Sequence, residues 1–200
     1  MAKIRQRVRA PQMQPEERRQ QLLAAGVTCI ASKGIGATKH ADLARACQVS
    51  VPAVFTYFPN REALVTSILS EVGERLIEHV IKPAQAMPDP NKRLAATAPL
   101  FADYAAQEPN YVKVWLMWSM HFSPEVRAQY QKFETRVIDA LGKMIVDGAG
   151  SAGPEEDIQD RARMILASSA FLAKMVFDNV SEKRRNAFAE HVLVPLASGV

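Results

Sequence analysis

The sequence predicts an all-α protein with about nine helices. Apolar residues recur every three or four positions through most of the 200 residues, which is the spacing of one helix face. Prolines and glycines interrupt this pattern and mark the connections between helices. The segment YVKVW at 111–115 alternates as a strand would, but its surroundings contain no turn residues, so we predict a buried helix there.

Composition limits the class of protein. With 48% hydrophobic and 23% charged residues, the chain has the make-up of a folded globular protein rather than a disordered one. Cys29 and Cys47 are too few for a disulfide scaffold, so we expect a reducing compartment and small core residues at both positions. The absence of an 18-residue apolar window and of a secretory signal favours a cytoplasmic protein.

Positive charge is concentrated in the first third of the chain. Residues 1–65 contain ten Lys or Arg against four Asp or Glu, a net charge of +6, whereas residues 66–200 contain 15 against 17, a net charge of −2. This asymmetry indicates contact with nucleic acid or another anionic surface through the N-terminal part. A basic tail that serves only solubility is the alternative.

The N-terminal residues divide into an arm and a first helix. Residues 1–14 are expected to form a flexible basic arm, because their charges follow no helical stripe. A helix is predicted to begin at Pro15, since proline suits a first helical turn, and to end at Lys33 and Gly34. Its apolar face comprises Leu22, Leu23, Gly26, Val27, Ile30 and Ala31.

Two short helices follow, separated by a three-residue break. Thr38 is predicted to cap the first of them, which includes Ala41–Cys47, and Ser50 to cap the second. Residues 15–60 are therefore predicted to form a helix-turn-helix domain, with the third helix offering one face to the major groove. A small three-helix bundle with a polar surface is the alternative. Helical spacing places Val51, Val54, Phe55 and Phe58 toward the interior, and Pro52, Ala53, Thr56 and Tyr57 outside.

Residues 61–200 are predicted to form a larger helical domain. Its helices are expected at about 61–81, 91–107, 109–121, 124–147, 155–180 and 183–197. The four histidines are far apart and follow no metal-binding spacing, and no nucleophile elbow, phosphate loop or glycine fingerprint occurs. We therefore expect no metal, no cofactor and no enzymatic activity.

The order DLA…VS…V..YFPNREALV extends over about 30 positions and includes Asp42-Leu43-Ala44, Val49-Ser50, Tyr57-Phe58-Pro59 and Arg61-Glu62. It resembles the DNA-binding domain of TetR-type bacterial transcriptional regulators. That resemblance implies a three-helix DNA-binding domain, a connecting fourth helix, and a helical domain that dimerises and often binds a small ligand. It also implies a location on the bacterial nucleoid.

A longer stretch, GIGATKHADLARACQVSVPAVFTYFP, and the segment KVWLMWS at 113–119 are similar to the LuxR/HapR-like branch, the quorum-sensing master regulators of vibrios. This similarity implies a global regulator of gene expression, acting as an activator or a repressor. Relatives of that branch commonly have Asn at the position of Thr56 and no proline at that of Pro52, so a different target sequence is expected.

The motif, the charge and the resemblance together imply a homodimer on a near-palindromic DNA operator. Small outer side chains on the third helix would let its backbone approach base edges, and basic or polar neighbours would contact phosphates. Arginines of the arm are expected in the flanking minor groove. The expected base contacts are Val51, Pro52, Ala53 and Thr56, the phosphate contacts are Thr38, Lys39, His40, Ser50, Tyr57 and Arg61, and the arm residues are Arg5, Arg7 and Arg9.

The resemblance to TetR-type regulators implies a dimer interface formed by the last two helices, and their residues suit that role. Residues 165–177 are apolar almost all round, and the final helix contributes Phe188, Val192, Leu193 and Leu196. Burial within one subunit is the alternative. An apolar ligand pocket is also expected, with plain core packing as its alternative. The residues assigned to the pocket are Leu76, Val80, Trp115, Trp118, Phe122, Phe133, Met144, Met164 and Phe171.

Two further functions remain open from the sequence. One is a local repressor of an adjacent gene that a ligand releases from DNA. The other, of a different class, is a small-molecule-binding helical protein for which DNA contact is secondary.

Overall fold

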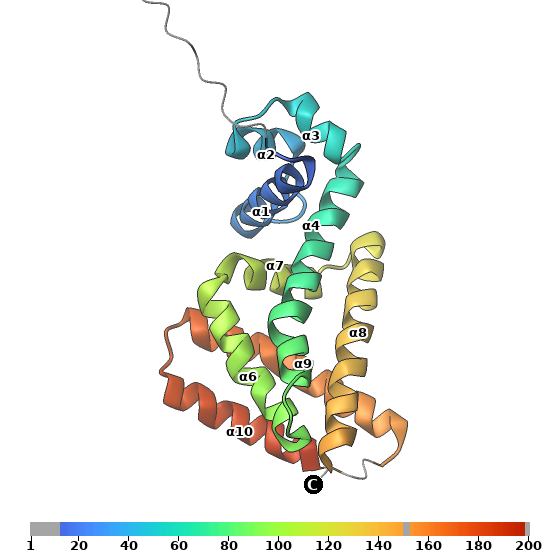
Figure 1. Ribbon diagram of the computed structural model, residues 1–200, viewed down its shortest axis with the longest axis vertical. Coiled ribbons are helices and arrows are strands. Elements are labelled where there is room, and N and C mark those ends of the chain that lie inside the picture. The colour runs from blue at the N-terminus through green and yellow to red at the C-terminus, as the bar shows by residue number, and fades with distance from the viewer. Residues whose placement is uncertain (1–12, 150–152, 199–200) are drawn as a thin grey trace, which may run out of the picture.

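The computed structural model describes residues 13–149 and 153–198, and every regular element in these ranges is helical, which confirms the all-α prediction. Figure 1 shows a small helical N-terminal lobe at one end and a larger helical body at the other, with α4 (Arg61–Leu76) running from the lobe into the body. Arg5, Arg7 and Arg9 lie outside the described residues.

The N-terminal lobe consists of α1 (Pro15–Lys33), α2 (His40–Cys47) and α3 (Val51–Tyr57). The predicted apolar stripe of α1 is buried except at Ala31, which is half-buried, and the ends of the helix match the prediction. The α2 helix begins one residue later than a Thr38 cap would require, because Lys39 is the N-cap and Asp42 accepts a hydrogen bond of 2.9 Å from its backbone N–H. After α2 the chain reverses at Gln48, which has a left-handed backbone with φ of 55°.

The connecting helix is longer than predicted and changes its winding. Helix α4 (Arg61–Leu76) continues into a π-helical turn, η1 (Ile77–Ile81), and then into α5 (Lys82–Gln85). In this turn the backbone N–H of Lys82 donates to the carbonyl oxygen of Ile77, five residues back. Pro83 explains the widened turn, because its ring has no N–H and would collide with the carbonyl four residues earlier in a regular helix.

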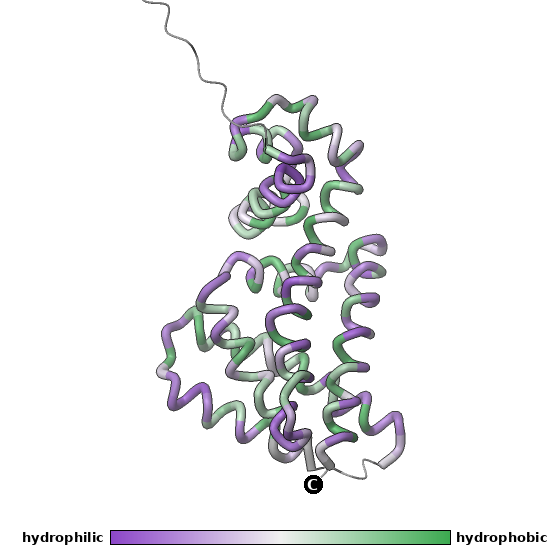
Figure 2. The backbone as a smooth tube through the Cα atoms, viewed as in Figure 1, coloured by the Kyte–Doolittle hydropathy of each residue, from purple (hydrophilic) through white to green (hydrophobic). Residues whose placement is uncertain are grey.

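The body contains α6 (Pro90–Gln107), α7 (Pro109–Ser119), α8 (Pro124–Ala149), α9 (Glu155–Phe177) and α10 (Glu182–Ser198), close to the predicted bounds. Hydrophobic and hydrophilic residues alternate along these helices, as Figure 2 shows, because each helix turns one face to a common core. Trp115 and Trp118 are among the largest fully buried side chains of that core. No helix of the described residues is long and apolar enough to cross a membrane.

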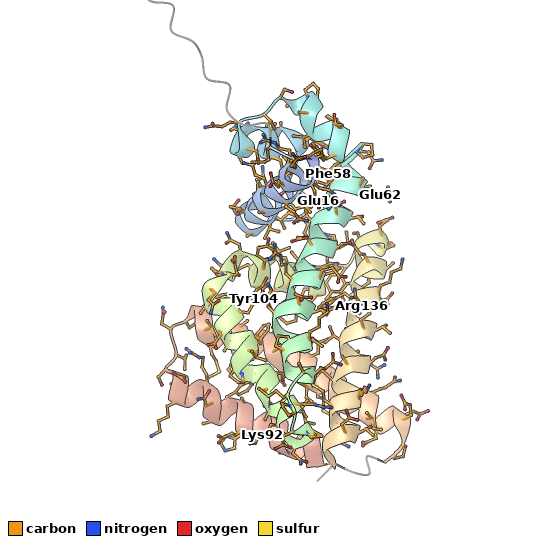
Figure 3. The ribbon with its side chains drawn as sticks, viewed as in Figure 1. Glu16, Phe58, Glu62, Lys92, Tyr104 and Arg136 are labelled. Atoms are coloured by element: carbon orange, nitrogen blue, oxygen red, sulfur yellow. The ribbon has the colours of Figure 1, made fainter. Side chains whose placement is uncertain are left out.

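Close packing holds α4 against α8. A Cβ atom on Gly73 would lie 2.9 Å from Cδ2 of Phe133, so only glycine allows the observed approach of the two helices. One turn further along α8 lies Arg136, which is labelled in Figure 3. Its guanidinium forms a two-pronged ion pair with the carboxylate of Glu74. These contacts tie the helix that carries the N-terminal lobe to the body.

Candidate nucleic-acid interface

Helix α3 turns an exposed face with short side chains to the solvent. Ser50 caps its N-terminus, as predicted, because the side-chain oxygen accepts a hydrogen bond of 3.3 Å from the N–H of Ala53. Pro52 and Thr56 are exposed, and Val51 is exposed at the start of the helix. Val54 and Phe58 are fully buried, as predicted. A two-turn helix of this kind can approach base edges closely.

Phe55 and Val51 depart from the prediction that they face the interior, because 44% of the Phe55 surface and 37% of the Val51 surface are exposed. The buried face of α3 accommodates Val54 and Phe58 but not a third large side chain. The ring of Phe55 instead lies flat on the ring of His40, with centroids 4.0 Å apart and planes within 6°.

The structure also corrects the expected phosphate contacts of two residues. Thr38 is fully buried and its hydroxyl donates to the carbonyl oxygen of Gly34 at 3.1 Å. His40 is 6% exposed, and its Nε2 lies 2.8 Å from the carbonyl oxygen of Phe58. Because both side chains are enclosed and hydrogen-bonded within the lobe, neither presents a donor to a phosphate.

Four expected phosphate contacts remain at the surface. Lys39 and Ser50 are exposed, and Tyr57 is half-buried. Arg61 is exposed, and its Nη2 donates to the carbonyl oxygens of Ile35 and Gly36, each at 3.0 Å. That pair of bonds holds the α1–α2 loop against the start of α4 and leaves further N–H groups on the guanidinium.

Two more exposed residues of this lobe were not among the predicted contacts. Arg45 on α2 is mostly solvent-exposed although it lies 3.6 Å from Asp42, and the basic charge of residues 1–65 is the signal that could have singled it out. Phe55 on α3 gave no such signal, because its spacing matched the buried face.

Polar and sulfur groups around α1 and α2 serve the fold. Hydrogen bonding to Lys33 lowers the pKa of Asp42, whose carboxylate also caps α2. Cys29 and Cys47 are half-buried, and burial raises the pKa of both thiols, which favours their protonated form. No group of three or more His, Cys, Asp or Glu among the described residues is placed to hold a metal ion.

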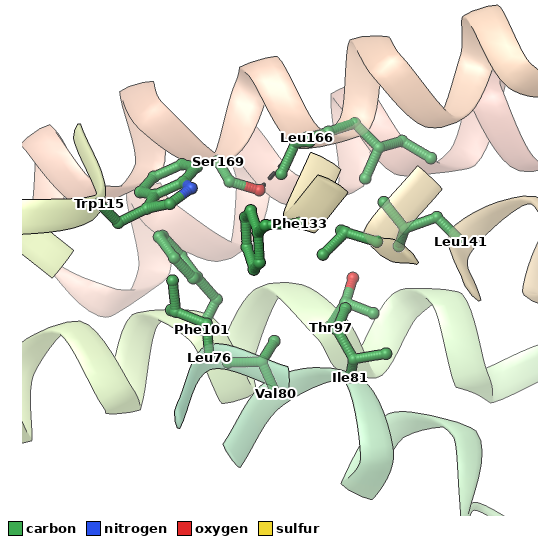
Figure 4. Close-up of a pocket in the computed structure, with 12 residues that line it drawn as sticks. Leu76, Val80, Ile81, Thr97, Phe101, Trp115, Phe133, Leu141, Leu166 and Ser169 are labelled. Atoms are coloured by element: carbon green, nitrogen blue, oxygen red, sulfur yellow. Dashed lines mark hydrogen bonds between the residues drawn. The ribbon is translucent and has the colours of Figure 1, made fainter. Parts of the chain in front are cut away.

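The body contains a small apolar cavity of about 40 Å³, enough for a few water molecules. It lies where η1 and helices α4, α6, α7, α8 and α9 meet, and no charged side chain lines it (Figure 4). Thr97 and Ser169 supply its hydroxyl groups, which already donate to backbone carbonyls of their own helices. Its full lining is Leu76, Val80, Ile81, Thr97, Phe101, Trp115, Phe133, Val137, Leu141, Ile165, Leu166 and Ser169.

Four of the nine residues predicted for the ligand pocket line this cavity, namely Leu76, Val80, Trp115 and Phe133. The other five lie elsewhere for different reasons. Trp118 and Met144 are buried in the core, and the indole N–H of Trp118 donates to Val126 at the start of α8. Phe122 is 86% exposed in the α7–α8 connection, and Met164 and Phe171 are exposed on α9. The aliphatic lining residues that we missed carry no sequence signal that distinguishes them from core.

An apolar strip remains uncovered on α9 and α10. Phe171 is 54% exposed, and its ring lies 5.1 Å from that of Phe188 on α10. Within the predicted interface segment, Ile165, Leu172, Ala173 and Met175 are buried inside the subunit. Burial inside the chain therefore accounts for part of this apolar helix, and Met164 and Phe171 are left facing outward.

Comparison with known sequences finds similarity to bacterial transcriptional regulators. Residues 22–68 match the family described as bacterial regulatory proteins, tetR family. The HTH-type transcriptional regulator LuxR of Vibrio harveyi is 32% identical over 114 residues. That match covers 57% of this chain and 56% of LuxR, little more than half of each protein.

Solved structures share the fold of the whole described chain. The regulator FadR of Bacillus subtilis, solved with stearoyl-CoA, superposes with a TM-score of 0.73 at 20% identity, covering 90% of this chain and 98% of FadR. FadR of Bacillus halodurans gives 0.75 at 18% identity, covering 94% and 98%. AibR, solved with isovaleryl coenzyme A and operator DNA, gives 0.71 at 19% identity, covering 90% and 98%.

Proposed function

Because residues 22–68 carry the N-terminal domain of the tetR family of bacterial regulatory proteins, and the described chain has the fold of TetR-like regulators, we propose that this protein is a DNA-binding transcriptional regulator. One observation carries the proposal: α3, capped by Ser50, exposes Pro52 and Thr56 on the N-terminal lobe, and the lobe lies within the basic first 65 residues, whose net charge is +6. Backbone phosphates attract such a lobe, and a short-chained helix fits the major groove.

The proposed DNA contacts are the predicted residues that are exposed or half-buried at the surface of the lobe. Val51, Pro52, Ala53 and Thr56 read base edges, and Lys39, Ser50, Tyr57 and Arg61 bind phosphates. Arg5, Arg7 and Arg9 of the arm at 1–14 enter the flanking minor groove. The domain bounds remain 15–60 for DNA binding and 61–200 for dimerisation and ligand binding.

A homodimer through α9 and α10 completes the proposal. A single α3 covers one major-groove segment, and a two-fold dimer reaches the next one about 34–36 Å away. The exposed Phe171 and Met164 on α9 supply apolar surface for that contact. The protein would act in the bacterial cytoplasm, on the chromosome.

The test is selection of DNA by the purified full-length protein from a random-sequence pool, followed by affinity measurements at several salt concentrations. Enrichment of one near-palindromic sequence supports the proposal. Recovery of no sequence above background sinks it.

Deleting residues 1–10 tests the arm separately. Removal of its arginines should weaken binding. It should also reduce the slope of log affinity against log salt concentration by about one unit for each lost phosphate contact. An unchanged salt slope would remove the arm from the interface.

Two modes of regulation have different support. The LuxR relative favours a global regulator of the quorum-sensing type. The apolar cavity beside α4 favours a second candidate, a repressor that a ligand releases from its operator, since FadR and AibR were solved with acyl-CoA ligands. Genome-wide mapping of bound sites separates them, because hundreds of sites indicate a global regulator and one site beside its own gene a local one.

The size of the cavity is also relevant to the remaining candidate function, a small-molecule-binding helical protein for which DNA contact is secondary. At about 40 Å³, without a charged lining residue, it would have to open before it accepted a ligand of acyl-CoA size. A rise in melting temperature with an apolar compound, together with failure of the DNA selection, would favour that function.

A further inference from the structure

His40 joins the start of α2 to the end of α3. It is the first residue of α2, and its Nε2 lies 2.8 Å from the carbonyl oxygen of Phe58, the residue that ends α3. The flat face of the same imidazole covers the ring of Phe55, at 4.0 Å between centroids. One side chain thus contacts α3 at two points, one polar and one aromatic.

The polar contact has a defined direction. A carbonyl oxygen can only accept a hydrogen bond, so Nε2 must carry the proton and donate it. The carbonyl of Phe58 lies at a helix end, where no backbone N–H of α3 follows to satisfy it. The imidazole therefore satisfies a buried acceptor that would otherwise have no partner.

Helix α3 has few fully buried side chains of its own. The helix has seven residues, and Val54 is the one among them that is fully buried. Phe58 follows as its buried C-cap. A short helix held by so few buried side chains can rotate about its long axis unless another group prevents it. His40 is placed to prevent that rotation, because its ring stacks on Phe55 and its Nε2 bonds to the carbonyl oxygen at the end of the helix.

We propose that His40 is a positioning residue that sets the rotation of α3 and thereby the sequence preference of the protein, without touching DNA. The proposal rests on the DNA-binding function proposed above. Rotation of α3 would move Pro52 and Thr56 relative to base edges while leaving the basic charge of the lobe unchanged. Sequence-specific affinity should therefore depend on His40, and nonspecific affinity should not.

Two substitutions separate the polar contact from the aromatic one. His40→Gln keeps an N–H donor at nearly the reach of Nε2, and His40→Phe keeps a flat ring against Phe55 but has no donor. Each full-length variant is measured on the duplex selected by the wild-type protein and on a scrambled duplex of the same composition, below its melting transition. We expect His40→Phe to lose about 10-fold in affinity for the selected duplex, because returning α3 to its binding rotation without this contact should cost on the order of one hydrogen bond. His40→Gln should restore most of that loss.

The outcomes distinguish this proposal from the DNA-binding function. Equal losses on both duplexes, or an unchanged preference in His40→Phe, would overturn the positioning role while leaving DNA binding intact. If the wild-type protein selects no sequence, the function itself fails and the positioning role falls with it.

A measurement on the free wild-type protein covers the case in which His40→Phe does not fold. Nitrogen NMR should show His40 with its proton on Nε2, and that proton should exchange slowly with water. A proton on Nδ1 alone, or rapid exchange, would contradict the proposal.

Discussion

Asp42 makes two interactions in the N-terminal lobe that can be tested separately. Its carboxylate accepts a hydrogen bond from the N-cap residue Lys39 and forms an ion pair with Lys33. Asp42→Ala removes both interactions and should lower the free energy of unfolding by about 1 kcal/mol, the usual effect of losing a helix cap, as measured by urea denaturation. Lys33→Gln is the matched control, because it removes the ion pair and keeps the cap, and should lose about 0.5 kcal/mol or less.

The same residue gives a pH dependence with a definite sign. Folding lowers the pKa of Asp42 below its ordinary value of 3.8, mainly through the hydrogen bond from Lys33. Its contribution to stability is therefore present above about pH 4 and is lost as the pH falls further. The difference between the wild-type protein and Asp42→Ala should shrink in that range, and a constant difference would argue against the ion pair.

The raised pKa of Tyr130 predicts that the free energy of unfolding decreases at alkaline pH. Burial, more than the nearby charge of Glu134, raises its pKa from 10.0 to about 12. The neutral phenol is thus favoured in the folded protein, so its contribution is complete below pH 10 and is lost as the pH rises toward 12. Tyr130→Phe should unfold with a weaker pH dependence between those values, measured by denaturation at several pH values. Identical pH profiles for both proteins would show that Tyr130 does not contribute.

Single residues of the site were predictable where spacing alone decides burial. Val54 and Phe58 follow from helical periodicity. Phe55 does not, because its exposure depends on the width of the buried face, and the enclosure of His40 depends on the carbonyl of Phe58, 18 residues away. Local sequence contains neither fact.

At the scale of helices, Gly26 sets the spacing of α1 and α4. A Cβ atom at this position would lie 2.4 Å from Cδ1 and 2.7 Å from Cγ1 of Ile68. Gly26→Val should therefore destabilise the protein by about 2 kcal/mol or more through overpacking, measured by chemical denaturation. Gly36→Ala is the control, because nothing lies within 4 Å of its added methyl group. Equal stability of the two variants would mean that α1 and α4 can separate without loss.

Helix positions were predicted more accurately than helix geometry. Prolines, glycines and apolar spacing placed the bounds of α1, α3, α6, α8 and α9 within a few residues. The π-helical turn at Ile77–Ile81 was not predicted. A proline normally ends a helix, but here packing against the body keeps the chain helical, and the backbone accommodates Pro83 by widening one turn. The cap at Lys39 was missed because Asp42 supplies the capping oxygen from inside the helix.

For the whole molecule, the α9–α10 strip predicts a dimer that one substitution can break. Phe171→Asp would place a charge in the proposed apolar contact and should give a monomer in analytical ultracentrifugation, with helical content unchanged. Phe122→Asp is the control, because that side chain is 86% exposed in the α7–α8 connection, and the variant should remain dimeric. A dimeric Phe171→Asp would require a different interface.

The two proposed sites differ in how far the sequence could predict them. The proposed DNA-facing lobe combines a local motif in residues 15–60 with the net charge of +6 over residues 1–65, so its position followed from the sequence, as did the exposure of Pro52 and Thr56. The cavity draws its lining from six helical segments between residues 76 and 169, and its aliphatic residues look like any other core. Only the assembled fold distinguishes them.

Sequence-specific binding by the full-length protein is tested most directly by its equilibrium affinity for the selected duplex and for a scrambled one, measured by fluorescence anisotropy at physiological salt. We predict a preference of about 1,000-fold or more for the selected duplex. Equal affinity for the two duplexes would contradict the assignment of α3 as a sequence-reading helix and leave only an electrostatic contact with DNA.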